Sequence, residues 1–77
     1  MAENLTFKYD ALSDILYINK CQPYIEQESE EIGDDIIARL NPNTGEVENL
    51  EVLFFSQRLK QQPEWQIPVM ANLRLTV

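Results

Sequence analysis

Apolar and polar residues alternate in several short runs along this chain, and a period of two predicts β-strands. Leu5, Phe7 and Tyr9 alternate with polar residues, which predicts a first strand with one apolar face. Residues 15–20 are apolar on both faces, so we expect a central strand that is covered on both sides. The short polar segment 10–14 between the two runs predicts an antiparallel hairpin.

The middle of the chain contains three further strand signals. Residues 24–32 are mostly acidic and polar, which is typical of an edge strand, where charge discourages association with other edges. Residues 36–40 and 47–55 alternate clearly and are separated by the turn-forming sequence 41–45. Gly45 suits the left-handed position of a bulged hairpin, and Gly33 predicts an earlier turn with positive φ.

The C-terminal third predicts one helix and one strand. Ser56 is suited to cap a short helix over residues 57–62, which Pro63 would end. Residues 69–77 alternate cleanly and predict a last strand. This strand either joins the same sheet or reaches across to a second subunit.

These elements predict an α+β fold that is mainly β. We expect an antiparallel β-meander sheet of five or six strands with one short helix near the C-terminus. No linker or repeat divides the chain, so residues 1–77 are expected to form a single domain.

The length of the chain limits the size of its core. A domain of 77 residues buries only about 60–65% of the surface of its unfolded chain. Cys21 is the only cysteine and there is no histidine, so neither a disulfide nor a zinc site is expected to stabilise the fold. Association between chains is the remaining common way to stabilise a domain with so small a core, and we expect a homodimer.

Charge limits the partners. The chain has 13 acidic and 6 basic side chains, a net charge of -7, which opposes binding to nucleic acids and to anionic membranes. It permits a small basic protein partner, although a generally acidic surface explains the same composition. A lone cysteine, the absence of an apolar run of about 20 residues and the lack of an export signal favour a cytoplasmic location.

Sequence motifs for catalysis are missing. There is no histidine base, no glycine-rich phosphate loop and no serine with an activating partner. We therefore expect neither an enzyme nor a cofactor. Asp10 and Asp14 bracket the first turn, and aspartates at such positions usually accept hydrogen bonds from backbone N–H groups rather than share a cation.

Two sets of residues are candidates for binding. Carboxylates crowd the segment before the predicted strand at residues 36–40. There they could meet a basic partner, bind a divalent cation weakly or simply face water. This acidic set comprises Glu28, Glu30, Glu31, Asp34 and Asp35. The second set contains aromatic and leucine side chains that are suited to an interface between subunits, because adjacent aromatics in a strand point to opposite faces and one of them needs a cover. This candidate interface comprises Phe54, Phe55, Trp65, Leu73 and Leu75.

Three short motifs together resemble a small prokaryotic family catalogued as domain of unknown function 2283. They are Tyr9-Asp10 followed by SDILYI at 13–18, SEEIGDDII at 29–37, and NTGEV at 43–47. The resemblance covers about residues 7–56, with Asn49 where glycine is common, and leaves 57–77 outside it. It implies a small β-rich domain without an established activity. Such proteins are often encoded beside small basic proteins that resemble ribonuclease-type toxins, which implies an antitoxin-like role.

The sequence therefore predicts a non-enzymatic, acidic protein-interaction module that associates with itself. Two alternatives stay open. One is an antitoxin-like inhibitor of a small basic ribonuclease-type toxin, and the other is a protein that binds a divalent cation or a small ligand.

Overall fold

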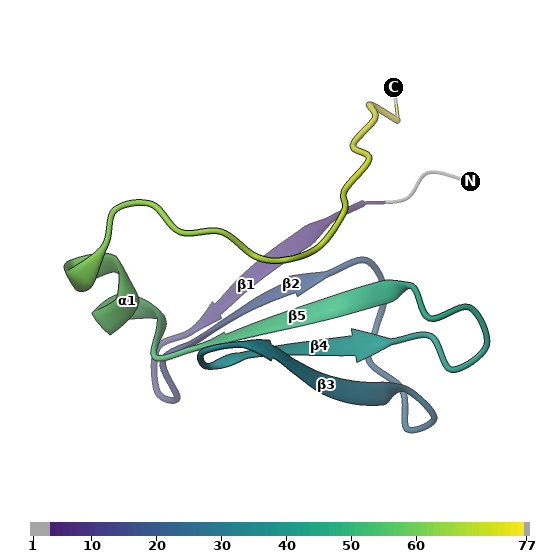
Figure 1. Ribbon diagram of the computed structural model, residues 1–77, viewed down its shortest axis with the longest axis horizontal. Coiled ribbons are helices and arrows are strands. Elements are labelled where there is room, and N and C mark those ends of the chain that lie inside the picture. The colour runs from purple at the N-terminus through teal and green to yellow at the C-terminus, as the bar shows by residue number, and fades with distance from the viewer. Residues whose placement is uncertain (1–3, 77) are drawn as a thin grey trace.

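Five antiparallel strands form one sheet, and a short helix follows the last of them (Figure 1). The computed structural model describes residues 4–76. Its elements are β1 (Thr6–Asp10), β2 (Ile15–Asn19), β3 (Glu28–Gly33), β4 (Ile36–Leu40), β5 (Val47–Leu53) and α1 (Phe55–Gln61). This confirms the predicted fold class. No helix in the described part of the chain is long and apolar enough to cross a membrane.

The strand order is β1-β2-β5-β4-β3, with every neighbouring pair antiparallel. The order departs from a simple meander at one point, because the connection over residues 20–27 carries the chain from β2 to the far edge at β3. As a result β5, which carries the buried Leu50 and Val52, lies in the middle of the sheet between β2 and β4.

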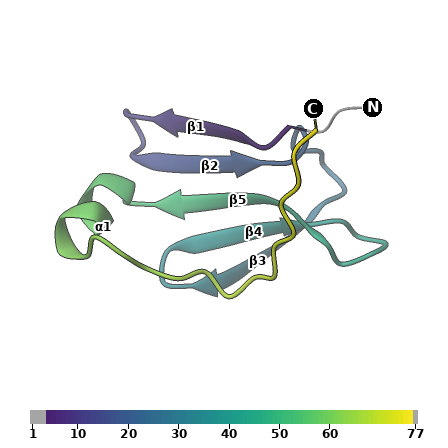
Figure 2. The ribbon, with the colours of Figure 1, turned by 90° about the horizontal axis from the view of Figure 1, so that it is seen from above.

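One face of the sheet carries the core. Val52 of β5 lies between Leu16 and Ile36 on the neighbouring strands, and Leu50 lies between Ile18 and Ala38. The buried core consists of Ile36, Ala38, Leu50 and Val52. Helix α1 lies at the end of the sheet where β5 ends, and the segment after it passes over this face (Figures 1 and 2). Phe55, Trp65 and Ile67 from these two parts pack against the core.

The connection over residues 20–27 covers Asn49 at one end of the opposite face. The rest of that face is not covered by any other part of residues 4–76, so the prediction that β2 is covered on both sides is wrong. Every residue of β2 is only half-buried. On the uncovered face, Tyr17 pairs across the sheet with Lys8 and Glu51. Glu51 in turn forms a salt bridge with Arg39 at 2.6 Å. Because this row of side chains across the sheet is largely charged, it can face water, and the sheet needs no second layer there.

The turns follow the predicted chemistry with one exception. Gly45 has φ 75° in the β4–β5 connection, as predicted, and the Asn41 side chain accepts hydrogen bonds from two backbone N–H groups of that turn. At the β3–β4 turn the positive φ falls on Asp35 (60°), not on Gly33. Gly33 is still part of β3, whose pairing shifts by a bulge between Glu31 and Gly33. Aspartate tolerates the left-handed region well enough to take over this role.

Helix α1 begins earlier than the sequence predicts. Its N-cap is Phe54, in the left-handed region at φ 54°, and no side chain caps the helix locally. Ser56 is therefore inside the first turn, and the prediction that it caps the helix is wrong. The reason is that β5 ends at Leu53, so the chain turns into the helix directly at Phe54.

The predicted last strand is not formed by residues 69–76, which we call the tail; Val77 lies outside the described residues. Trp65 and Ile67 pack on the core face, and the tail then crosses above the strands instead of running along an edge (Figure 2). A chain that crosses strands in this way cannot make ladder hydrogen bonds with them, which explains why the alternating pattern forms no strand within this chain.

Candidate functional site

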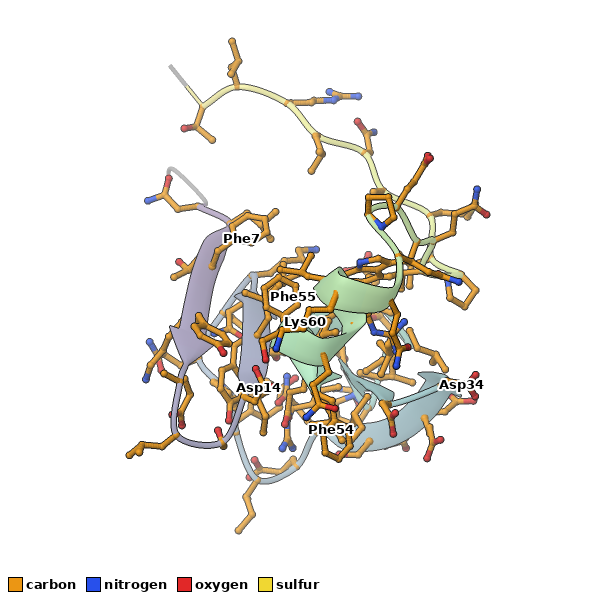
Figure 3. The ribbon with its side chains drawn as sticks, turned by 90° about the vertical axis from the view of Figure 1, so that its left-hand side faces the viewer. Phe7, Asp14, Asp34, Phe54, Phe55 and Lys60 are labelled. Carbon is orange, nitrogen blue, oxygen red and sulfur yellow. The ribbon has the colours of Figure 1, made fainter. Side chains whose placement is uncertain are left out.

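Aromatic side chains line the part of the core face between β1 and α1. The Phe55 ring lies 5.8 Å from the Tyr9 ring and 6.4 Å from the Trp65 ring, both in tilted or edge-on geometry that favours aromatic pairs. Phe55 and Trp65, two of the predicted interface residues, thus pack within the chain's own core. In Figure 3, Phe54 lies on the opposite side of the sheet from Phe55 and Phe7.

Asp14 fixes the helix against the first hairpin. Its carboxylate accepts hydrogen bonds from the Tyr9 hydroxyl (2.6 Å), from the Ser56 backbone N–H (2.9 Å) and from the Ser56 hydroxyl (2.8 Å). Its backbone carbonyl accepts the Phe55 N–H at 3.0 Å. These hydrogen bonds lower the pKa of Asp14 from its usual 3.8, and the bond from the Tyr9 hydroxyl is the largest cause. Asp14 therefore does from a distance what a local N-cap usually does.

Asp10 has the predicted structural role in the same turn. Its carboxylate accepts the backbone N–H groups of Leu12 (3.0 Å) and Ser13 (3.4 Å). Hydrogen bonding with Ser13 lowers the pKa of Asp10. Asp10 thus serves the backbone of the turn as expected, whereas the carboxylate of Asp14 bonds Tyr9 and the distant Ser56 instead.

An apolar strip stays uncovered beside the aromatic cluster. Phe7 is 62% exposed, although it pairs with Ile18 and projects from the core face of the sheet (Figure 3). Tyr9 and Leu5 are 46% and 42% exposed. We call these three side chains the open strip. Two predicted interface residues in the tail, Leu73 and Leu75, are even more exposed, at 79% and 89%.

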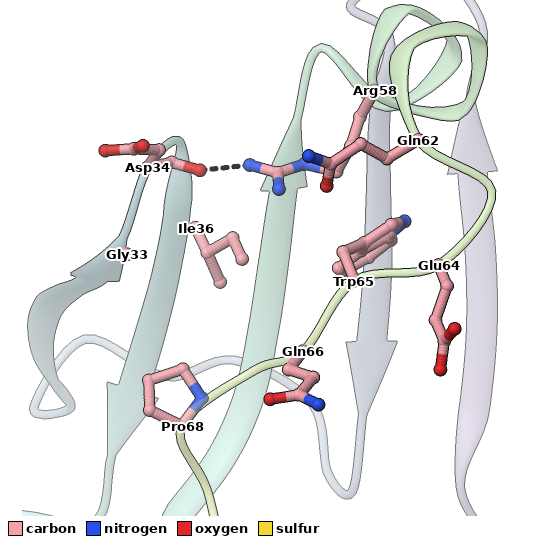
Figure 4. A pocket seen from close by; sticks show the side chains of 9 residues that line it. All are labelled: Gly33, Asp34, Ile36, Arg58, Gln62, Glu64, Trp65, Gln66 and Pro68. Carbon is pink, nitrogen blue, oxygen red and sulfur yellow. Dashed lines mark hydrogen bonds between the residues drawn. The ribbon is translucent and has the colours of Figure 1, made fainter.

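A shallow hollow of about 560 Å³ lies on the other side of α1 (Figure 4). The guanidinium of Arg58 stacks on the Trp65 ring, 5.0 Å from its centre, and donates a hydrogen bond to the backbone carbonyl of Asp34. Pro68 and Ile36 form the apolar part of its wall. These contacts attach the start of the tail to the β3–β4 side of the sheet.

A polar cluster holds the connection over residues 20–27 against β5. Asn49 is 1% exposed, and its amide donates to the Asn19 side chain (2.9 Å) and the Cys21 carbonyl (2.7 Å). Its side-chain oxygen accepts from the Gln27 amide at 2.7 Å. Every side-chain polar atom of Asn49 is therefore satisfied, as a buried amide requires.

Glu48 extends this cluster to the surface. It accepts hydrogen bonds from the Tyr24 hydroxyl (2.6 Å), the Gln27 amide (3.0 Å) and the Asn41 amide (3.2 Å). The bond from Tyr24 lowers the pKa of Glu48 and, with it, raises the pKa of Tyr24 to about 12. Burial and the nearby Glu48 charge raise the pKa of the Cys21 thiol, so this cysteine is not activated as a nucleophile.

The acidic set lies along β3 and the turn after it. Glu28 and Glu30 are opposite Leu40 and Ala38 and so share one face, as the alternation predicts, whereas Glu31 points to the other. Asp34 and Asp35 follow in the turn, and all five side chains are exposed. Within residues 4–76, no three His, Cys, Asp or Glu side chains converge closely enough to hold a metal ion.

The comparisons with known proteins give a family and no relative of known activity. No curated protein and no solved structure matches the chain significantly. Residues 6–56 match the family described as Protein of unknown function (DUF2283). The match runs from the first residue of β1 to the second residue of α1, and so includes Asp14 together with the Ser56 that it binds. The chain belongs to the DUF2283 family.

Proposed function

We propose that the protein is a non-enzymatic interaction module that associates with itself through the open strip. The observation that carries this proposal is the exposure of Phe7, which leaves 62% of a large aromatic side chain in water beside a formed aromatic cluster. Tyr9 lies next to it on the same face and contacts Phe55. Contiguous apolar surface of this kind marks sites of protein association.

The small core supports the same proposal. Only four apolar residues are buried among the described residues, and the outer strand β1 contributes none of them. Burial of apolar surface stabilises by roughly 25 cal/mol per Å². A second copy that covers the open strip would add an apolar layer where the chain itself supplies none, which is the common remedy for a domain of this size.

The carboxylates with lowered pKa values support a role other than catalysis. Asp14 and Glu48 each accept three hydrogen bonds from side chains or backbone of the same chain. Their lowered pKa values keep them ionised as hydrogen-bond acceptors. A general acid at neutral pH needs a raised pKa instead, so these two groups are suited to holding the fold together.

Replacing Phe7 with aspartate tests the self-association. We expect Phe7→Asp to raise the dimer dissociation constant at least about tenfold, because a charge replaces the most exposed ring of the strip. Light scattering over a concentration series measures the change. Thr6→Asp is the matched control, because it adds the same charge to the adjacent exposed residue of β1, on the opposite face. An equal effect of both variants, or of neither, would contradict the proposal.

The acidic set favours a second candidate, capture of a small basic protein. Its five carboxylates are exposed along β3 and the following turn. The salt bridge found in the described part of the chain, Arg39–Glu51, uses a different carboxylate. Negative charge along an edge speeds association with a basic partner. This effect becomes smaller as the salt concentration rises, because salt screens the attraction. A basic ribonuclease-type toxin is the partner that the family resemblance implies.

Isolation of the tagged protein from its own cells distinguishes the two candidates. A basic partner recovered in equal amounts at low salt, and lost at high salt, would support charge-driven capture. Recovery of dimer alone at both salt concentrations would leave self-association as the function of the surface.

A further inference from the structure

We propose that the tail of one copy adds as an edge strand to β1 of a second copy, and that each copy of the dimer does this to the other. This proposal rests on the self-association proposed above and names the segment that covers the open strip. Reciprocal exchange of this kind is an isologous arrangement, which closes at two subunits.

The tail has the pattern of a strand and lacks a partner within residues 4–76. Val69, Ala71, Leu73 and Leu75 alternate with Met70, Asn72, Arg74 and Thr76. Leu73 and Leu75 are 79% and 89% exposed, and beyond the Val69 N–H, which bonds to Ile67, the described tail makes no backbone hydrogen bond. By adding to the edge of a sheet, such a segment can bury its apolar side chains and pair its free N–H and C=O groups at the same time.

The two outer strands of the sheet are β1 and β3, and the tail fits β1 better. Beside β1, its apolar residues would lie next to Phe7 and Tyr9 on the core face. Beside β3, the same residues would lie next to Glu28 and Glu30, or next to Ser29 and Glu31 if the strand were turned over. Cross-strand pairs of aromatic and aliphatic side chains stabilise a sheet, whereas aliphatic side chains opposite exposed carboxylates do not.

Charge favours the same edge. The chain has a net charge of -7, and the outer strand β3 carries three of its glutamates. β1 is at the opposite edge of the sheet and contains one lysine and one aspartate. A dimer joined at β1 therefore keeps the two acidic edges apart, which limits the repulsion between the subunits.

Distance indicates that the acceptor is a second copy. Pro68 lines the hollow with Gly33 and Ile36, so the tail starts on the β3–β4 side of the sheet. A strand outside β1 lies four strand spacings from β4, about 19 Å at ~4.8 Å each. Crossing that distance takes about six residues at ~3.3 Å per residue, which leaves too few to pair with β1 of the same chain. The partner's β1 has no such restriction.

Disulfide trapping tests which strand the tail contacts. In a Cys21→Ser background, one full-length chain carries Lys8→Cys on β1, and a second, differently tagged chain carries Asn72→Cys or Arg74→Cys in the tail. Directly opposite residues in a sheet bring their Cβ atoms close to disulfide distance. After mixing and mild oxidation we expect the mixed disulfide between β1 and the tail to dominate. The control chain carries Ser29→Cys on β3, and equal or greater trapping there would overturn the proposal.

A second comparison separates this proposal from self-association as such. Leu73→Asp with Leu75→Asp adds two charges to the apolar side of the tail, and Asn72→Asp with Thr76→Asp adds two to the polar side. We expect the first pair to raise the dimer dissociation constant at least about tenfold and the second less than about threefold. If neither pair changes it while Phe7→Asp does, strand exchange is wrong and the open strip is covered in another way. If Phe7→Asp also has no effect, the proposed function fails as well.

Discussion

Replacing Asn49 with alanine is expected to lower the free energy of unfolding by about 3 kcal/mol. Asn49 is 1% exposed and makes three side-chain hydrogen bonds. Alanine would remove all three bonds, and an intramolecular hydrogen bond contributes roughly 0.5–1.5 kcal/mol. The loss is a large share of the roughly 4–12 kcal/mol expected for a chain of this length.

This loss has a specific structural meaning. Asn49 attaches residues 20–27 to β5, and this connection brings β3 to the far edge of the sheet. Urea unfolding at a single low protein concentration measures the effect without a contribution from association. Asn43→Ala in the exposed β4–β5 turn is the matched control and should change the free energy of unfolding by less than about 0.5 kcal/mol. A change below about 1 kcal/mol for Asn49→Ala would show that the connection is held by other contacts.

Replacing Asp14 with asparagine is expected to destabilise the protein at neutral pH and to have a shrinking effect as the pH falls. The folded-state pKa of Asp14 is lowered, first by the Tyr9 hydroxyl and then by the Ser56 N–H. A lowered pKa means that the ionised group stabilises the fold above its unfolded value of 3.8, and that this stabilisation is lost as the pH falls through the folded-state pKa. Below that range the native chain and the variant should converge.

Thermal melts of both proteins between about pH 7 and pH 2.5 measure this convergence. Asp35→Asn is a close control, because Asp35 has nearly the same left-handed backbone (φ 60° against 57°) and is exposed. Asparagine tolerates that conformation as well as aspartate does. We therefore expect little change for Asp35→Asn at any pH. A difference between native chain and Asp14→Asn that stays constant from neutral to acidic pH would mean that the carboxylate charge does not attach the helix.

Local patterns in the sequence predicted most of the sheet. The alternation around Phe7 and Tyr9, the apolar run of β2 and the turn before Gly45 all gave the strands and hairpins that the structure contains. These signals depend on neighbouring residues alone. The position of β5 beside β2 does not, because it follows from the burial of Val52 and Leu50 between strands that are distant in sequence.

The contacts that join distant segments were not predictable in the same way. Asp14 and Ser56 are far apart in the chain, and each alone is a common turn or cap residue. Asn49 lies two residues before Glu51 in β5 and so shares its face, which the alternating pattern indicates to be exposed. Only the connection over residues 20–27 buries Asn49. Its one signal was the departure from the glycine that is common there in the family.

The tail illustrates the opposite case, in which the sequence contains a pattern that the single chain does not use. Alternation from Val69 to Leu75 predicts a strand. Trp65 and Ile67, however, attach the preceding segment to the core, and the tail starts on the β3–β4 side, too far from β1 of the same chain to pair with it. The candidate interface therefore divides into two parts. Phe55 and Trp65 pack inside the chain, whereas Leu73 and Leu75 stay available to a second copy.

Sedimentation velocity of the unmodified chain, over protein concentrations from about 5 µM to about 1 mM, tests the central claim of self-association most directly. We expect the weight-average mass to rise from that of the 9.0 kDa chain to twice that value and then to stay constant, as a closed dimer requires. A mass of one chain at every concentration would contradict the claim, and a mass that rises without limit would contradict the closed, reciprocal arrangement.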